Sequence, residues 1–277
     1  MSGRRPAFQL PADACDAHCH VFGPAATFPY APERRYTPAD APKQALAALH
    51  QRLGVTRAII VQASCHGRDN RAMLDAIAAD PARRRGVAIV DDTFDEVALA
   101  GLHEGGVRGV RFNFVRHLGG APDLAIVRSV LERVRGLGWH LVLHLDAADI
   151  EALMGFITAL PLPFVIDHMG RVPSAAGLGQ APFRALLEVA RRDNCWIKVC
   201  GAERISRPPY AAAVPFARAL IEASPMRVLW GSDFPHPNLD HPADEADLVD
   251  LIPAIAPEPV AQRRLLVDNP AQLYGFS

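Results

Sequence analysis

Residues 15–24 read CDAHCHVFGP, and this stretch decides between two α/β folds. An apolar run ends here in two histidines, His18 and His20. The first strand of a doubly wound, dinucleotide-binding sheet would normally be followed by a glycine fingerprint, which is missing at this position. Titratable side chains at the carboxyl end of a strand are typical of the catalytic face of a (β/α)8 barrel. The stretch therefore favours the barrel.

Strand-like and helix-like segments alternate along the rest of the chain. Eight short apolar runs, each followed by a helical stretch, are the pattern of a TIM barrel, so we expect residues 1–277 to form one (β/α)8 domain of the α/β class. The Pro-rich loop Val21–Asp40 is expected to lie over the barrel mouth. The predicted strands are Cys15–His20, Ala58–Gln62, Gly86–Val90, Arg108–Phe112, His140–Leu145, Phe164–Asp167, Trp196–Val199 and Val228–Gly231. The predicted helices are Ala41–Leu53, Asn70–Ala79, Asp95–His103, Leu124–Leu137, Ala148–Leu160, Phe183–Arg192, Ala211–Ala223, Ala243–Ile252 and Pro259–Val267.

The composition limits the classes of function. Hydrophobic residues make up 50% and charged residues 21% of the chain, which is typical of a globular protein and excludes a disordered one. A formal net charge of −1 gives no overall field that would attract nucleic acid or an anionic membrane, so we expect neither as a partner. No apolar tract is long enough to span a membrane. The five cysteines form no CxxC pair, and no apolar segment follows Arg4 and Arg5, so we expect a cytoplasmic protein with reduced thiols.

Polar and titratable residues recur where the predicted strands end, which is where a barrel carries its catalytic groups. Two histidines on the first strand, a histidine after the sixth and an aspartate after the eighth, in that order, form the strongest part of the pattern. Alternation along the first strand puts His18 and His20 on one face together with Asp16, with Cys15 and Cys19 facing the helices. His50, on a predicted helix, is expected at the surface. The candidate site residues are His18, His20, Ser64, Arg111, Arg116, His117, His144, His168, Arg204 and Asp233.

The chain resembles the amidohydrolase superfamily in its second branch, and more closely the 2-pyrone-4,6-dicarboxylate lactonases. The resembling stretches run from the first strand to the last helix: AHCHVFGP (17–24), FPYAPERRYTPADA (28–41), VQASCHGRDN (61–70), LHEGGVRGVRFNF (102–114), VIDHMGR (165–171), WGSDFPHPNL (230–239) and LLVDNPAQLY (265–274). The family fold is a (β/α)8 barrel, in agreement with the strand pattern. The family's substrate is a small anionic lactone formed in the catabolism of lignin-derived aromatic compounds, which is opened to a muconate- or oxalomesaconate-type acid.

The resemblance also implies roles for the site residues. Asp233 matches the family's general base, while His18, His20 and His168 match the groups that polarise the lactone carbonyl. Arg111 and Arg204 match arginines that bind substrate carboxylates, a task that suits the guanidinium fork. Tyr36 and Ser64 match hydroxyl groups that bind the substrate.

Two positions depart from the family pattern. The family has a further carboxylate-binding arginine at the position of His117, and here an arginine precedes it, at Arg116. The family's substrate-binding tyrosine on the fifth strand corresponds to His144. We therefore expect either Arg116 or His117 to bind a second carboxylate, and these departures bear on which lactone is used rather than on the reaction type.

The metal requirement follows from the same residues. His18, His20, His168 and Asp233 could together hold one zinc ion. A bridged pair of metals is disfavoured because the end of the fourth strand carries Arg111 and no lysine. The lactonases that the chain resembles act without a metal, and an arginine beside the site opposes a cation. We therefore expect no cofactor to be required.

Three rival hypotheses remain open. The first is a mononuclear zinc-dependent amidohydrolase or a non-oxidative decarboxylase of the same superfamily. The second is a lactonase for another lactone. The third is a barrel that binds an acidic ligand without catalysing its hydrolysis, which is disfavoured because the proposed base, histidines and arginines are all present.

Overall fold

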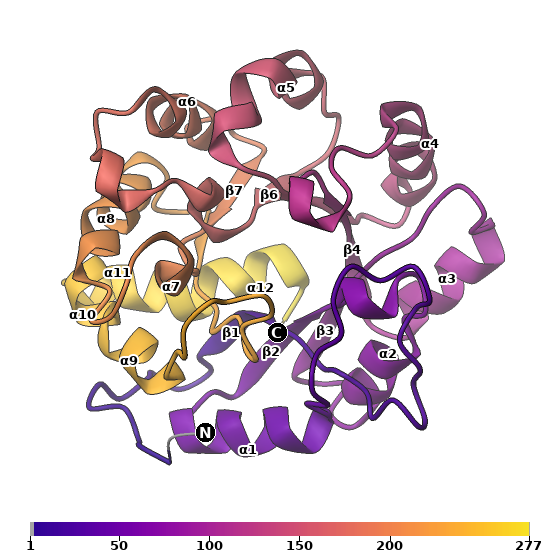
Figure 1. Cartoon of the computed structure of the whole chain (residues 1–277), viewed down its shortest axis with the longest axis horizontal. Helices are drawn as coiled ribbons and strands as arrows, with labels where there is room; N and C mark the ends of the chain where they lie inside the picture. The colour runs from indigo at the N-terminus through magenta and orange to yellow at the C-terminus, as the bar shows by residue number, and fades with distance from the viewer. Residues whose placement is uncertain (1–2, 277) are drawn as a thin grey trace.

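Eight parallel strands form the barrel that the sequence predicts (Figure 1). The computed structural model describes residues 3–276, and each strand pairs with the next in sequence order. The strands are β1 (Cys15–Cys19), β2 (Arg57–Val61), β3 (Arg84–Ala88), β4 (Val107–Asn113), β5 (His140–His144), β6 (Phe164–Ile166), β7 (Cys195–Lys198) and β8 (Val228–Leu229). The fold is a single-domain TIM barrel.

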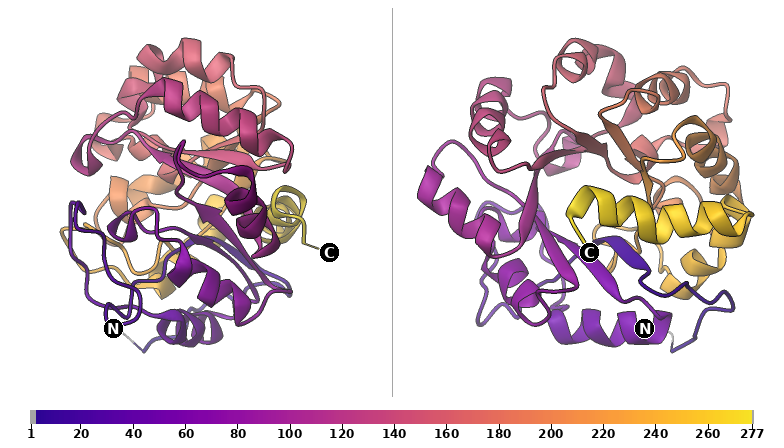
Figure 2. Two further views of the ribbon diagram at one scale, coloured as in Figure 1. Left: turned by 90° about the vertical axis from the view of Figure 1, so that its right-hand side faces the viewer. Right: turned by 180° about the vertical axis from the view of Figure 1, so that it is seen from behind.

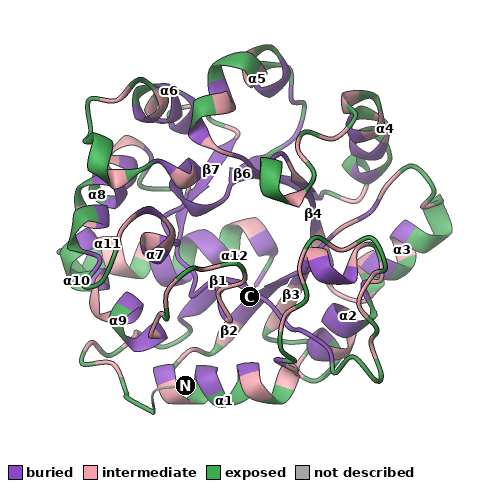
Figure 3. Ribbon diagram, viewed as in Figure 1, coloured by how far each residue is buried: buried purple, intermediate pink, exposed green. Residues whose placement is uncertain are grey.

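Helices surround the barrel and bury their apolar faces against it, so that the strands are covered on both sides (Figure 3). They are α1 (Lys43–Leu53), α2 (Arg71–Ala78), α3 (Glu96–Glu104), α4 (Leu124–Arg135), α5 (Ile150–Thr158), α6 (Ala181–Ala190), α7 (Ala202–Ile205), α8 (Val214–Ala223), α9 (Glu245–Asp250), α10 (Ile252–Ile255), α11 (Pro259–Arg263) and α12 (Asn269–Tyr274). Within residues 3–276, no helix has the length and apolar character needed to cross a bilayer.

The C-terminal segment closes the amino end of the barrel, where α12 lies across the strands (Figure 2). Tyr274 and Phe276 belong to the cluster of side chains that fills the barrel interior, which includes Ile59, Val142 and Val165. The predicted last helix, Pro259–Val267, was therefore too short, because the chain continues through a π-helical turn, Arg264–Asp268, into α12. The candidate site therefore lies at the opposite end of the barrel, at the carboxyl ends of the strands.

The barrel closes through backbone hydrogen bonds between β1 and the segment that follows β8. Ala17 N donates to Trp230 O at 2.8 Å, and Asp233 N donates to His18 O at the same distance. At Gly231 the two segments are so close that an added Cβ would lie 2.5 Å from His18 N. A glycine is therefore required where the end of β8 passes His18.

The expected side-chain alternation along β1 is wrong at its start. The pairing of β1 with β2 shifts register between Asp16 and Cys19, as at a β-bulge. Cys15 consequently packs inside the barrel, and Asp16 points outward to His50 on α1. His18 and His20 nevertheless face the same site, and Cys19 faces the helices as predicted. His50 is buried, not at the surface.

Candidate active site

The structure brings together the four side chains whose order in the sequence formed the strongest pattern. Oδ1 of Asp233 lies 3.4 Å from Nε2 of His20, 3.6 Å from Nε2 of His18 and 3.9 Å from Nε2 of His168. All four side chains are buried, and this oxygen has no hydrogen-bond partner among the described residues. His168 and Asp233 both adopt left-handed backbone angles, with φ of 53° and 58°. Such angles are costly for residues other than glycine and are concentrated at functional sites.

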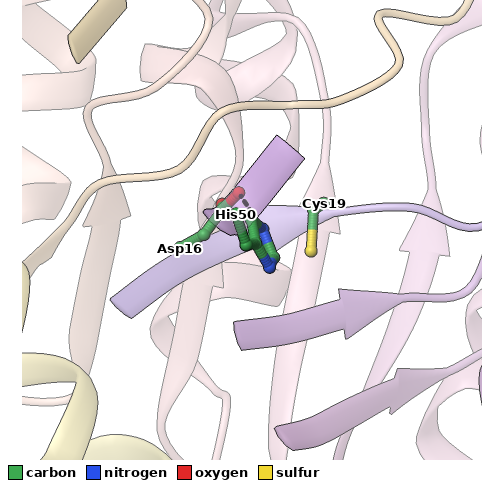
Figure 4. Close-up of side chains that lie close together, drawn as sticks. All are labelled: Asp16, Cys19 and His50. Carbon is green, nitrogen blue, oxygen red and sulfur yellow. Dashed lines mark hydrogen bonds and ion pairs between the residues drawn. The ribbon is translucent and has the colours of Figure 1, made fainter. Parts of the chain in front are cut away.

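Asp16 fixes the backbone on both sides of the β1–β8 seam. Its carboxylate accepts hydrogen bonds from His18 N at 3.1 Å, from Ser232 N at 2.9 Å, from Ser232 Oγ at 2.5 Å and from His50 Nε2 at 3.1 Å. Figure 4 shows the side chains of Asp16 and His50 close together, beside the strand that also carries Cys19. Because four donors already occupy this carboxylate, the group of Asp16, Cys19 and His50 does not resemble an open metal site. Its effect is to hold His18 and the residue before Asp233 in fixed relative positions.

A buried charge cluster lies beneath the histidines, and sequence reasoning missed two of its members. Lys198 and Asp167 are both fully buried, with Lys198 Nζ 3.1 Å from Asp167 Oδ1. Arg111 Nε lies 3.3 Å from the other oxygen of Asp167. Burial opposes ionisation of Asp167, but the ammonium of Lys198 outweighs it and holds the pKa of this carboxyl well below its usual range. Asp167 could have been found from the sequence, because it directly precedes the predicted site residue His168. No feature of the sequence marked Lys198 as part of the site.

Hydrogen bonds in this cluster determine which ring nitrogens of His18 and His20 carry a proton. Lys198 Nζ lies 2.9 Å from His18 Nδ1 and donates to it, so the neutral imidazole of His18 carries its proton on Nε2. That nitrogen lies 3.3 Å from Nε2 of His20, whose own Nδ1 donates to Val61 O at 2.8 Å. Burial and the neighbouring ammonium lower the pKa of His18 to about 3, so the ring is neutral near pH 7. His18 therefore points an N–H donor at the centre of the site.

Arg204 forms an ion pair with the second carboxylate oxygen of Asp233, Oδ2. Its Nε donates to Asp233 Oδ2, and its Nη1 donates to Pro237 O at 3.1 Å. Burial alone would raise the pKa of Asp233, but the guanidinium of Arg204 outweighs it and holds this pKa well below its usual range. In this state the carboxylate is a weak base, so any change that draws Arg204 away will make Asp233 more basic.

The site borders a small cavity of about 20 Å³, which has room for about one water molecule. Pro237 and Asn238 form part of its wall, and Asn238 also borders an open cleft of about 780 Å³ outside it. The predicted residues Tyr36 and Ser64 line this cavity, as do Arg111, His117, His144 and Arg204. Arg116 does not: it borders a separate surface cleft with Asp146 and Arg171.

Asn113, a further residue that sequence reasoning missed, joins two of the side chains that line the cavity. Its amide nitrogen lies 3.1 Å from Ser64 Oγ, and its amide oxygen lies 2.9 Å from His144 Nδ1. Nε2 of His144 is buried and has no partner among the described residues. Burial, together with the nearby guanidinium of Arg111, lowers the pKa of His144 well below its usual range, so this ring is neutral.

The donor types and spacing around Asp233 suit a zinc ion. Three imidazole nitrogens and one carboxylate oxygen are typical zinc ligands. The hydrogen bonds do not suit one, because a ligating nitrogen must offer a lone pair and Nε2 of His18 carries a proton when Lys198 donates to Nδ1. The guanidinium of Arg204 adds a further positive charge beside Asp233. The residues as arranged therefore do not fit a metal.

Comparison with known proteins adds to this geometry. Residues 15–276 match the family model described as amidohydrolase. A 2-pyrone-4,6-dicarboxylate hydrolase from Comamonas testosteroni is 48% identical over 98% of this chain and 92% of its own length. A 4-sulfomuconolactone hydrolase from Rhizobium radiobacter is 42% identical over 97% of this chain and 92% of its own. A crystal structure from Pseudomonas putida, provisionally described as a 2-pyrone-4,6-dicarboxylic acid hydrolase, superimposes with a TM-score of 0.86 at 34% identity. The match covers 97% of this chain and 99% of that one.

Proposed function

The chain belongs to the amidohydrolase family, and from that premise we propose that it hydrolyses 2-pyrone-4,6-dicarboxylate to an open-chain oxalomesaconate-type acid. One observation supports the proposal most strongly. Asp233 Oδ1 lies within 3.9 Å of three imidazole Nε2 atoms, beside a cavity lined by Arg111 and Arg204. Ester hydrolysis needs a base for water and donors for the carbonyl oxygen, and a dicarboxylate needs cations. The reaction belongs to the breakdown of lignin-derived aromatic compounds.

Substrate binding prepares the base. A carboxylate of the lactone attracts Arg204, which then leaves Asp233 Oδ2. Without its guanidinium partner, the buried Asp233 gains proton affinity. Because the cavity has room for only about one water molecule, a lactone can enter only if side chains of the wall, among them Pro237 and Asn238, are displaced.

The chemistry then proceeds in two steps. Asp233 Oδ1 takes a proton from water while the water oxygen bonds to the lactone carbonyl carbon, and the carbonyl oxygen gains negative charge. His18 donates a hydrogen bond from Nε2–H to that oxygen. The imidazoles of His20 and His168 lie beside the same reaction centre. When the carbonyl re-forms, the ring C–O bond breaks and the leaving oxygen receives the proton from Asp233. The products are an enol and a new carboxylic acid, which loses its proton to solvent.

The remaining residues of the cavity bind the substrate. Arg111 and Arg204 pair with carboxylates, and Tyr36 and Ser64 supply hydroxyl groups. His117 takes the place of the family's further arginine, because it lines the cavity whereas Arg116 does not. His144, held through Asn113, stands where the family has tyrosine.

Turnover in this proposal requires no metal. The hydrogen bond from Lys198 to His18 and the guanidinium on Asp233 support it. A zinc ion at His18, His20, His168 and Asp233 would instead supply a Lewis acid. The close spacing of His18, His20 and Asp233 is the observation behind the zinc-dependent hydrolase as a second candidate.

We also propose a cytoplasmic location, which the five free, buried cysteines support.

A substrate panel tests the proposal. Purified protein is assayed with 2-pyrone-4,6-dicarboxylate, 4-sulfomuconolactone and muconolactone, each with and without a chelator, and carbon dioxide release is followed in parallel. We expect the dicarboxylate to be hydrolysed fastest with chelator present and no carbon dioxide to form. Preference for 4-sulfomuconolactone would identify a different lactonase, and carbon dioxide release would identify a decarboxylase. Binding of the lactones without turnover would leave a ligand-binding barrel.

A further inference from the structure

We propose that Lys198 is a positioning residue that fixes the tautomer of His18 and thereby excludes metal from a cluster whose spacing suits zinc. The proposal deepens the proposed function, on which its catalytic part rests. The metal-binding part stands on the geometry of the cluster alone.

Three contacts define the arrangement. Lys198 Nζ lies 2.9 Å from His18 Nδ1 and 3.1 Å from Asp167 Oδ1, and His18 Nδ1 lies 3.3 Å from the same oxygen. All three side chains have no exposed surface. The ammonium has protons for both neighbours, so it satisfies Nδ1 and the carboxylate together.

The consequence appears on the other side of the ring. With Nδ1 accepting, the neutral imidazole of His18 must hold its proton on Nε2, the atom that lies 3.3 Å from His20 Nε2. His20 can accept that proton in a hydrogen bond because its own Nδ1 is bound to Val61 O. The Nε2 atom of His18 therefore carries a hydrogen in the direction in which a bound metal would need a lone pair.

Without this hydrogen the cluster would match a metal site. Zn–N bonds of about 2.0 Å place neighbouring ligand atoms of a tetrahedral site roughly 3.3 Å apart. The donor atoms of His18, His20 and Asp233 lie 3.3 to 3.6 Å apart. Loss of Lys198 would let His18 Nδ1 donate to Asp167, and a carboxylate holding the far nitrogen is the usual support of a metal-bound histidine.

Zinc binding by Lys198→Met tests this directly, since methionine fills a similar volume but donates no hydrogen bond. The chain has one other lysine, Lys43, which pairs with Asp75 away from the site, so Lys43→Met is the matched control. Each protein is stripped with chelator, titrated with zinc chloride in a calorimeter, dialysed and analysed for metal. We expect one zinc per chain in Lys198→Met, with an affinity at least about tenfold above wild type. The double variant Lys198→Met/His18→Ala should lose that zinc.

Stoichiometric zinc in the wild type, or none in folded Lys198→Met, would overturn the proposal. Circular dichroism checks folding, because the variant leaves Asp167 without one of its cations. If the variant does not fold, nitrogen NMR of histidine-labelled wild type decides: a protonated Nε2 and bare Nδ1 on His18 support the proposal, and the reverse tautomer refutes it. If no lactone is hydrolysed, the proposed function fails while the zinc comparison still stands.

The catalytic part has its own measurement. Lys198→Met should lower kcat at least about tenfold with little change in KM, because His18 then loses its donor to the carbonyl but no carboxylate-binding group is lost. A fall in thermal stability with unchanged kcat would mean that Lys198 is only structural.

Discussion

Arg204 donates a hydrogen bond from Nε to Asp233 Oδ2, whereas Asp233 Oδ1 faces three imidazoles and has no hydrogen-bond partner within residues 3–276. One oxygen of the same carboxylate is thus neutralised, and the other is left for a reacting molecule. This ion pair also links catalysis to substrate binding. Arg204 holds the proposed base, Asp233, and is also one of the arginines that we assign to a carboxylate of the substrate.

Asp233→Asn keeps the shape of the side chain but removes its ability to accept a proton from water. We expect kcat to fall by about 10²- to 10⁴-fold with folding little changed. Asp193→Asn serves as the control, since that carboxylate is fully exposed. Turnover near the wild-type rate in Asp233→Asn would remove this residue from the mechanism.

Arg204→Met should change both substrate affinity and pH dependence. A buried carboxylate left without its charged partner costs about 3–5 kcal/mol, so KM should rise several hundredfold or more. Arg204 lowers the pKa of Asp233, so that pKa should rise in the variant and the acid limb of kcat/KM should move to higher pH. An acid limb at the wild-type position would show that the two side chains are not coupled. The exposed Arg191→Met is the control.

His117 should make binding of a dicarboxylate depend on pH. Burial and the nearby Arg171 lower the pKa of His117, so in the free enzyme its imidazolium loses its proton below the ordinary value of 6.5. KM should therefore rise as pH increases through that lowered value, and His117→Gln should abolish the dependence. Arg116→Met should leave it intact, because Arg116 lies outside the cavity. A dependence lost in Arg116→Met and kept in His117→Gln would reverse this assignment.

Asp16→Asn tests the clamp across the β1–β8 seam. The amide has one acceptor oxygen for four donors and turns its own N–H groups toward some of them, so we expect a loss of about 1–3 kcal/mol in the free energy of unfolding. Burial raises the pKa of Asp16, but the hydrogen bond from His50 and the others outweigh it and the net pKa is lowered. Its ionised form therefore contributes stability above pH about 4, and this is lost as pH falls through the folded pKa. Urea unfolding at pH 7 and at pH 3 should show a smaller difference between variant and wild type at the lower pH.

The sequence predicted the barrel because the strands and helices of this fold follow local periodicity. It also predicted which residues stand at the carboxyl ends of the strands, since parallel strands all end on one face. That is why His18, His20, His168 and Asp233 could be brought together before their distances were known.

Contacts that depend on register or on distant segments were not predictable in this way. A bulge in β1 reversed the directions of Cys15 and Asp16, and alternation alone carries no sign of a bulge. The partner of Asp16, His50, lies 34 residues away on a helix, where an isolated histidine is usually solvated. Lys198 was missed because a lysine in an apolar strand attracts attention only when its buried partner, Asp167, is known.

Hydrolysis of a dicarboxylate lactone by Asp233 without a metal can be measured directly in metal-free protein. The rate of opening of 2-pyrone-4,6-dicarboxylate is followed by the protein and by Asp233→Asn, both stripped of metal and assayed in excess chelator. We expect full activity in the stripped wild type and a loss of about 10²-fold or more in the variant. A stripped wild type that is inactive until zinc is returned would contradict it.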